Sequence, residues 1–434
     1  MKSNTRNLTR CARLTDIPFV RLVVTTTVAL LLLASAGNLN AQVHSSARSA
    51  AMGGAYTGLA KGVDAAKYNP ANLGLKGYQK YALEFVSVGV NVSNNSFTLS
   101  DYNQYTGAVL STADKQDILD KIPGEGLKID ADVQATALSL ALGSLAFTVT
   151  GFAAADVNLN KDLVDLILNG NTFADTVFVT GSYSDGISYG TAGISYGTAL
   201  YTAGSRQLSV GLTAKYIYGF AVEELVELEG LAATYESGFQ GSGRAIVRTA
   251  EGGRGYGLDV GAALRFNDTY TAGIRIQNAL GQIKWNKGTQ EHGYIFEFDT
   301  ATVDDIEEDD YIGSDDYSID IDAFSTTLPT VMNVGFAKAS GRLLWAVDWI
   351  QGLDNTPGAS TKPHLAVGAE YSLLKILPIR AGYATGGDKN AAFSFGSGLN
   401  LIGFYLDAAV FTGTTGSVYS TKGANFAIST GLQF

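Results

Sequence analysis

The sequence predicts an all-β protein: an outer-membrane transmembrane β-barrel of about fourteen antiparallel strands, with an N-terminal segment folded into its lumen as a plug. Three observations predict it: an export signal, strands with one apolar and one small or charged face, and no later apolar stretch long enough for a membrane helix. In lipid only helices and closed barrels satisfy every backbone polar group. We therefore expect the protein in the outer membrane of a diderm bacterium.

A signal peptide is predicted at residues 1–41. Five basic residues, from Lys2 to Arg21, precede an apolar run at Leu22–Leu33, and small residues follow, with Ala41 as a candidate cleavage position. This order of charge, short apolar run and small residues is typical of a secretory signal that is removed after export. The apolar run is too short to span about 30 Å of hydrocarbon as a helix.

The composition disfavours several classes of protein. Charged residues make up 16% of the chain, against roughly 25% in ordinary globular domains. The net charge is -11, and removal of residues 1–41 would make it about -15, which disfavours nucleic acid as a partner. Cys11 is the only cysteine and lies within the predicted signal. We therefore expect no disulfide and no Cys-based metal site in the exported chain. No cofactor is predicted.

Alternation identifies the strands. In residues 208–220 one face is apolar and ends in Tyr216, Tyr218 and Phe220, whereas the other carries small residues and Lys215. Side chains alternate with a period of two along a strand, and aromatic girdles mark the two membrane interfaces of a barrel. Strands are predicted at 80–92, 131–142, 145–156, 187–202, 207–220, 256–266, 269–284, 326–338, 342–350, 363–373, 378–385, 391–401, 403–412 and 424–434.

Short and long connections alternate along the chain, as expected for a barrel with short periplasmic turns and long external loops. The long connections are predicted at 93–130, 157–186, 221–255 and 285–325. The last strand ends in Phe434, and an aromatic-terminated final strand resembles the signal read by the barrel-assembly machinery. Pairing this strand with the first would close the barrel and remove the sheet edges. We therefore expect the assembly machinery and membrane lipids as partners.

Charged residues on the small-residue face are expected to line a wet or ion-paired lumen, because a dry core would not hold them. The predicted lumenal charges are Lys215, Asp259, Arg265, Arg275, Arg342, Asp348, Glu370 and Arg380. Their mixed sign favours ion pairs that brace the wall or hold the plug over the one-sided ring of a selective ion pore. They also argue against a soluble all-β sandwich, the alternative fold.

Residues 42–78 do not alternate and are predicted to be the plug, ahead of a barrel domain at 79–434. Small residues dominate this segment, and Asn69-Pro70 marks a turn. Small side chains allow the close packing that a segment threaded into a barrel requires. Wall groups such as Arg265 or Arg275 are expected to hold the turn. The candidate ligand and plug residues are Met52, Tyr56, Asn69, Pro70 and Ala71.

Two motifs in this segment resemble a known family. The run Ala51-Met-Gly-Gly-Ala55, followed by Asn69-Pro70-Ala71, is similar to the N-terminal hatch of the FadL/TodX fatty-acid and hydrocarbon transporters, and to related PorV/PorQ-like barrels associated with secretion. The resemblance is specific over residues 45–75 and architectural elsewhere. It implies a hatch-plugged barrel that passes hydrophobic molecules inward and often releases them sideways into the membrane.

Two helices are predicted in the long external connections, near 113–122 and at 159–168. The second reads Leu-Asn-Lys-Asp-Leu-Val-Asp-Leu-Ile-Leu, which is amphipathic with helical spacing. Two interpretations remain open for these helices. They form a hydrophobic capture site, as the resemblance would suggest, or they simply cap the mouth of the barrel.

An acidic run at 297–322 holds twelve carboxylates and no Lys or Arg. Clustered carboxylates can bind Ca²⁺, but the spacing is not that of an EF-hand, and a solvated external loop is the favoured interpretation. The candidate Ca²⁺ ligands are Asp304, Asp305, Asp309 and Asp310. The three histidines lie in no hydrolase or zinc motif, so no enzyme activity is predicted. A barrel phospholipase is the enzyme alternative, since its catalytic groups would meet only in the fold.

Two functions from different classes follow. The first is a channel for passive uptake of small hydrophobic molecules, of the fatty-acid or hydrocarbon class, through the plugged barrel. The second is a surface scaffold or shuttle that binds secreted proteins, which long acidic loops would suit. A lipid or detergent tail held against the plug would favour the first, and co-purification of secreted proteins would favour the second.

Overall fold

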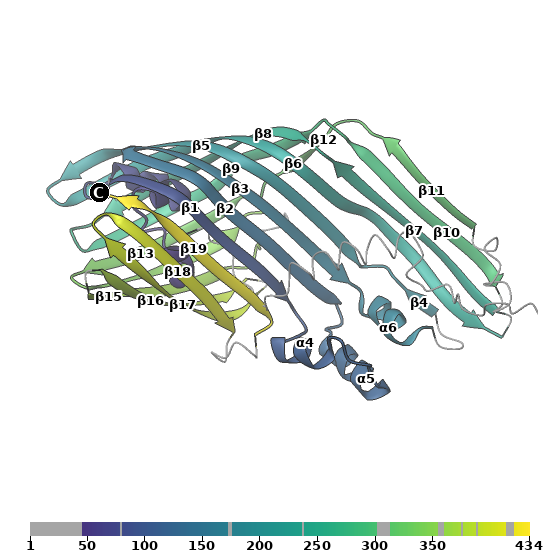
Figure 1. Ribbon diagram of the computed structural model, residues 1–434. Helices are drawn as coiled ribbons and strands as arrows, with labels where there is room; N and C mark the ends of the chain where they lie inside the picture. Colours follow the sequence, from purple (N-terminus) through teal and green to yellow (C-terminus); the bar gives the residue numbers. More distant parts are fainter. Residues whose placement is uncertain are drawn as a thin grey trace, which may run out of the picture.

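The computed structural model describes residues 46–78, 80–171, 176–236, 238–301, 313–354, 360–374, 376–387, 389–413 and 421–434. Fourteen strands close into an antiparallel barrel (Figure 1). These are β1 (Lys80–Asn94), β2 (Leu127–Gly143), β3 (Leu145–Leu159), β5 (Tyr183–Ala203), β6 (Arg206–Tyr235), β8 (Gly253–Arg265), β9 (Tyr270–Trp285), β13 (Val331–Ser340), β14 (Leu343–Gly352), β15 (His364–Leu374), β16 (Leu377–Gly386), β17 (Lys389–Leu401), β18 (Phe404–Gly413) and β19 (Gly423–Gln433). All fourteen predicted strands are confirmed.

The first and last strands of the barrel pair with each other. β1 runs antiparallel to β19, from Ala82 opposite Gln433 to Ser93 opposite Gly423. This pairing closes the wall, so the barrel exposes no free sheet edge to lipid. We call the end with short turns the periplasmic end and the end with long connections the outer end, following the usual orientation of outer-membrane barrels.

The two faces of the wall differ as the alternation predicts. On β6, Tyr216 and Phe220 are exposed on the outward face, whereas Thr213 is buried on the inward face. There its hydroxyl lies 2.8 Å from the hydroxyl of Ser195 on β5. Apolar side chains outside and small polar ones inside are what lipid around a polar lumen requires.

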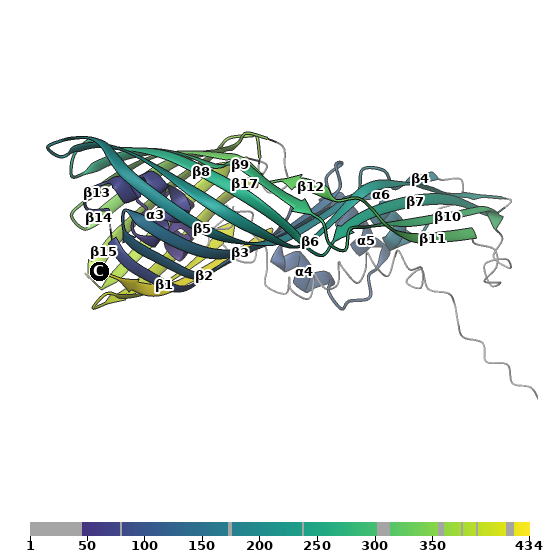
Figure 2. The same cartoon turned by 90° about the horizontal axis from the view of Figure 1, so that it is seen from above.

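The connections predicted as loops at 221–255 and 285–325 hold strands instead. β6 continues far past the wall to Tyr235 and pairs there with two further strands, and two more extend that sheet. The added strands are β4 (Thr176–Phe178), β7 (Gly238–Ala250), β10 (Gln290–Ala301) and β11 (Gly313–Asp320). We call these four strands with residues 221–235 the outer sheet; it projects beyond the barrel (Figures 1 and 2). The strands of the outer sheet carry many charges and lack the apolar alternation that is typical of strands facing lipid.

Three helices occupy the first two long connections: α4 (Leu99–Tyr105), α5 (Thr112–Lys121) and α6 (Lys161–Asn169). The two predicted helices are confirmed as α5 and α6, and α4 is an addition to the prediction. α5 and α6 pack on Leu127 and Leu159, at the outer ends of β2 and β3. None of the helices in the described part of the chain is long and apolar enough to cross a membrane.

Residues 46–78, which we call the lumenal segment, lie inside the barrel and form no strand (Figures 1 and 2). The segment contains α2 (Ala47–Ala51), α3 (Val63–Tyr68) and the 3₁₀ turn η2 (Pro70–Gly74). α2 packs against β17, β18 and β19, whereas η2 packs against β5, β6 and β8. The segment therefore reaches both sides of the lumen. The predicted signal and residues 42–45 of the predicted plug lie outside the described residues.

Candidate functional site in the barrel lumen

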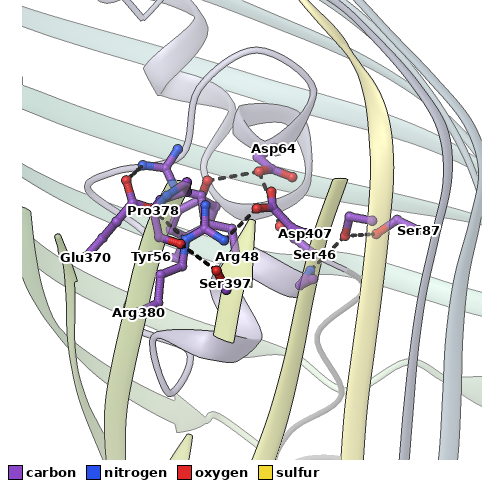
Figure 3. A network of polar contacts seen from close by, with 12 residues as sticks. Ser46, Arg48, Tyr56, Asp64, Ser87, Glu370, Pro378, Arg380, Ser397 and Asp407 are labelled. Carbon is purple, nitrogen blue, oxygen red and sulfur yellow. Dashed lines mark hydrogen bonds and ion pairs between the residues drawn. The ribbon is translucent and has the colours of Figure 1, made fainter. Parts of the chain in front are cut away.

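A network of ion pairs joins the start of the lumenal segment to the wall (Figure 3). Arg48, in α2, donates from Nε to Oε2 of Glu370 at 2.7 Å and from Nη2 to Oε1 at 2.9 Å. Arg380 donates to the same carboxylate at 2.7 Å and to Asp407 at 2.6 Å. Glu370, Arg380 and Asp407 are buried and lie on β15, β16 and β18. Removing one member of such a buried network leaves an uncompensated charge, so its loss is strongly destabilising.

A cavity of about 310 Å³ opens beside this network. Its walls include Arg48 and Asp407, and also Ile402 and Gly403 in the turn between β17 and β18. That turn is one of the short periplasmic ones, so the cavity lies toward the periplasmic end. The lumenal segment therefore does not fill the cross-section completely on this side.

A second set of charges lies on α3. Nζ of Lys67 is 2.8 Å from Oε1 of Glu84, on β1, and 3.1 Å from Oδ1 of Asp64. Asp64 also accepts a hydrogen bond from the hydroxyl of Tyr56 at 2.9 Å, and Glu84 accepts one from Tyr405 at 3.2 Å. Burial alone would lower the pKa of Lys67, but the charges of Glu84 and Asp64 outweigh it and hold that pKa above its usual range. The ammonium group therefore stays charged in the lumen.

Asp348, on β14, binds the middle of the segment through its backbone. Oδ2 of this buried carboxylate accepts from the backbone N–H of Tyr56 at 3.0 Å and of Thr57 at 2.8 Å. Two amides aimed at one carboxylate oxygen form a small anion-binding site. The wall thus holds this turn whatever its side chains are.

The predicted turn Asn69-Pro70-Ala71 lies against β5, β6 and β8. Nδ2 of Asn69 donates to the carbonyl oxygen of Ala262 at 3.2 Å, and the hydroxyl of Ser209 donates to that of Ala71 at 2.6 Å. Proline fixes its own φ and disfavours a helical conformation before it, and Asn69 is accordingly extended, with φ -162° and ψ 102°. The turn is therefore held in one shape from within and from the wall.

The expected partners of this turn were Arg265 and Arg275, and that expectation is wrong. Arg265 donates to the carbonyl oxygen of Lys76 at 2.7 Å, further along the segment. Arg275 pairs with Asp259 at 2.8 Å. A compact turn lies too close to the wall for a long guanidinium side chain to fit between, so short groups hold it instead.

Glycines in the wall make room for the segment. A Cβ on Gly211 of β6 would lie 2.3 Å from the carbonyl carbon of Pro70. On the far side, a Cβ on Gly382 of β16 would lie 2.3 Å from that of Met52, and one on Gly368 of β15 would lie 2.5 Å from the oxygen of Met52. Backbone meets backbone at these points, which only glycine permits.

The remaining predicted lumenal charges divide into two groups. Asp259 is buried and accepts from Lys215 at 2.6 Å and from Arg275 at 2.8 Å, which ties β6, β8 and β9 together. Arg342, however, is exposed in the turn between β13 and β14 and is not buried in the lumen. It follows the inward alternation, but it lies beyond the strand ends, where the periplasmic rim meets water.

Several charged members of the site are absent from the prediction. These are Arg48, Asp64 and Lys67 in the segment, and Glu84 and Asp407 in the wall. Glu84 and Asp407 stand on the inward faces of strands and could have been found from alternation alone. Arg48 and Lys67 could then have been matched to them by charge, although not to a particular partner.

The candidate Ca²⁺ ligands Asp304, Asp305, Asp309 and Asp310 lie outside the described residues. Within the residues that the structure describes, no group of three acidic, His or Cys side chains is placed to hold a metal ion.

Residues 74–245 match a family model described as a family of unknown function (DUF5723). No curated protein matches the sequence. Among solved structures, the Pseudomonas putida toluene transporter TodX is 12% identical, with 91% of this chain and 99% of that chain covered and a TM-score of 0.50. The Ralstonia pickettii toluene transporter TbuX is 14% identical, with 91% and 99% covered and a TM-score of 0.51. A Pseudomonas aeruginosa FadL homologue is 12% identical, with 92% and 99% covered and a TM-score of 0.50. The fold of this chain is therefore that of a FadL/TodX-like outer-membrane transporter.

Proposed function

We propose that this protein is an outer-membrane channel for passive uptake of small hydrophobic molecules, of the fatty-acid or hydrocarbon class, and that the lumenal segment is its hatch. The observation that carries the proposal is how the segment is held. Side chains at Arg48, Lys67 and Asp348 fasten it to the wall, and no strand ladder joins the two. Such a segment could shift without breaking any strand pairing of the barrel.

The outer half of the lumen supports a hydrophobic cargo. Ile217, Ile283 and Trp285 form a fully buried apolar cluster on the inward side of β6 and β9, and the half-buried Ile187 and Tyr189 pack against it, so a cargo would meet this cluster once its side chains part. Apolar lining with a few polar groups is usual for sites that bind hydrophobic ligands. The solved proteins with this fold include toluene transporters, which agrees with this class of cargo.

Within the proposed hatch, five buried residues would meet the ligand or move to let it pass. They are Met52, Tyr56, Asn69, Pro70 and Ala71. Met52 and Tyr56 pack in one apolar cluster with alanines of β13 to β16, and Ala71 packs in another with Ala263 of β8. A shift of the hatch would expose these alanine-lined surfaces to the lumen.

A reversible tether tests this proposal. A Cβ on Gly58 would lie 3.1 Å from that of Ala337 on β13, near the roughly 3.5–4.5 Å that a disulfide needs. The double variant Gly58→Cys with Ala337→Cys should lose saturable uptake of oleate or toluene when oxidised and regain it on reduction. The matched control is Ala337→Cys with Ala346→Cys, which tethers two wall strands at paired positions. Full uptake through the oxidised first variant would show that the segment is not a moving hatch.

The outer sheet favours a second function, a surface scaffold for secreted proteins. It carries β6 and its neighbours well beyond the wall, although a channel needs no such projection. Replacing residues 224–248 by a short turn should leave uptake intact if the channel proposal holds. The scaffold function would be favoured if the wild-type chain showed no saturable uptake and if the variant lost the secreted proteins that co-purify with the wild-type chain.

A further inference from the structure

We infer that α6 rests on the lipid surface of the outer leaflet, beside the barrel. The uncovered side of this helix is the starting observation. Ile167 is 67% exposed, although α6 has a strongly apolar side. An apolar side chain left open at that position calls for a partner that the folded chain does not supply.

The arrangement of residues around α6 makes the point sharper. At about 100° per residue, the polar residues Lys161, Asp162, Asp165 and Asn169 share one arc of the helix. Leu163, Val164, Leu166, Ile167 and Leu168 share the opposite arc, and Ile167 lies at its centre. Only one edge of that arc, at Val164 and Leu168, packs into the cluster formed with α5. The middle of the apolar arc is therefore the part left uncovered.

The position of α6 indicates that lipid is the partner of its open side. α6 and α5 pack on Leu127, Ile129 and Leu159, which cross-strand register places on the outward face of β2 and β3. Further down the same face are Val133 and Val149, which are exposed as lipid-facing side chains. The helices thus begin where the lipid-facing strip ends, and their open side continues that interface. In Figure 1, α4 and α5 lie beside the outer ends of β1 and β2.

The connection between α4 and α5 also leaves an apolar side chain open. Val109, between α4 and α5, is fully exposed. α5 and α6 are held to each other by two lysines: Lys161 donates to the carbonyl oxygen of Ile122 at 3.1 Å, and Lys115 donates to that of Leu168. The cluster can therefore act as one unit. With the Ile167 side chain toward the lipid, Asp162 and Asp165 on the opposite arc point to water, away from the headgroups.

Site-directed spin labelling on the full chain in phospholipid nanodiscs tests the inference. Ile167→Cys and its matched control Asp162→Cys, on the polar arc, would each carry a nitroxide. Collision with oxygen, which concentrates in lipid, is compared with collision with a water-soluble nickel chelate. Because an interfacial helix buries its apolar face about 5–10 Å deep, the oxygen-to-nickel ratio at position 167 should exceed that at 162 by about threefold or more.

Two results would overturn the inference. Equal ratios at 167 and 162 would place the open face in water. Protection of position 167 from both reagents would mean that protein, such as a second copy of the chain, covers it. If the label at 167 disturbs folding, Val109→Cys replaces it, since a fully exposed side chain has no packing to lose. An oxygen-to-nickel ratio at position 109 equal to that at 162 would also contradict the inference.

Discussion

The lumenal segment meets the two sides of the barrel in physically different ways. On the side formed by β14 to β18 and β1, carboxylates of the wall bind charges and amides of the segment, as at Glu370 with Arg48. On the side formed by β5, β6 and β8, backbone lies on backbone over glycines, as at Gly211 with Pro70. The first side adds ion pairs to close backbone contacts over Gly368 and Gly382, whereas contacts over glycine and hydrogen bonds hold the turn on the second side.

This difference indicates which side would release first. Ion pairs and amide hydrogen bonds exchange for water when groups separate, so part of their energy is recovered as the segment moves. A close steric fit, by contrast, contributes packing energy only when the turn lies fully against the wall. We therefore expect the side with the ion pairs to open first and the side formed by β5, β6 and β8 to act as the pivot.

The largest effect is expected from Glu370→Gln. It leaves Arg48 and Arg380 facing each other, with Asp407 as the remaining carboxylate of the network. Loss of one member of a buried ion pair typically costs about 3–5 kcal/mol. The variant should show a lower free energy of unfolding in detergent and higher ion conductance. Arg48→Met, which leaves Glu370 paired with Arg380, should be milder, and the reverse order would contradict the assignment of Glu370 as the hub.

Gly211→Ala should come next and act on the other side. Its Cβ would press on the backbone of Pro70, and overpacking of this kind costs about 1–3 kcal/mol. The turn should be displaced, which would be detected as protease sensitivity of the segment in an intact barrel. Gly151→Ala on β3 is the control, because its Cβ would have no neighbour within 4 Å. Equal sensitivity in both variants would remove the steric role of Gly211.

Asp348→Asn tests the contact between the wall carboxylate and the amides of Tyr56 and Thr57. The amide oxygen still accepts from Tyr56 and Thr57, but the charge is lost. The weaker hydrogen bonds lower the free energy of unfolding, but removal of a buried charge whose Oδ1 has no partner among the described residues raises it, so the net change should stay within about 1 kcal/mol. Hydrogen exchange at the amides of Tyr56 and Thr57 should quicken while that of the β14 amides is unchanged. Unaltered exchange at both amides would show that Asp348 does not hold the turn.

The smallest effect is expected outside the lumen, in the outer sheet. Glu227 on β6 and Arg244 on β7 lie 3.4 Å apart and are largely solvent-accessible. Exposed pairs of this kind contribute about 0–1 kcal/mol, so Glu227→Gln should leave the unfolding midpoint of the barrel nearly unchanged. A shift as large as that of Glu370→Gln would mean that ion pairs matter equally inside and outside the wall.

Which residues form the barrel wall could be predicted because the signal is local. The lipid-facing side chains of a strand such as β6 are apolar at every second position, whatever the partner strands are. The outer sheet projects beyond the barrel wall, and residues 238–250 and 290–301 carry no such contrast, so the sequence predicts them as loops. Arg342 shows a related limit of the prediction at the periplasmic end of the barrel. Alternation assigns this residue to the inward face but does not show that the strand ends before it.

The sequence by itself determined the barrel, its strand order, the small-residue segment ahead of it and helices α5 and α6, since each depends on periodicity or composition within a short stretch. Only the tertiary structure decided the site. Arg48 meets Glu370, and Ser209 meets Ala71, across long separations in the chain. Such partners are chosen by barrel closure and register, which bring inward faces around one segment. Periodicity shows which residues face inward, and closure decides which of them meet.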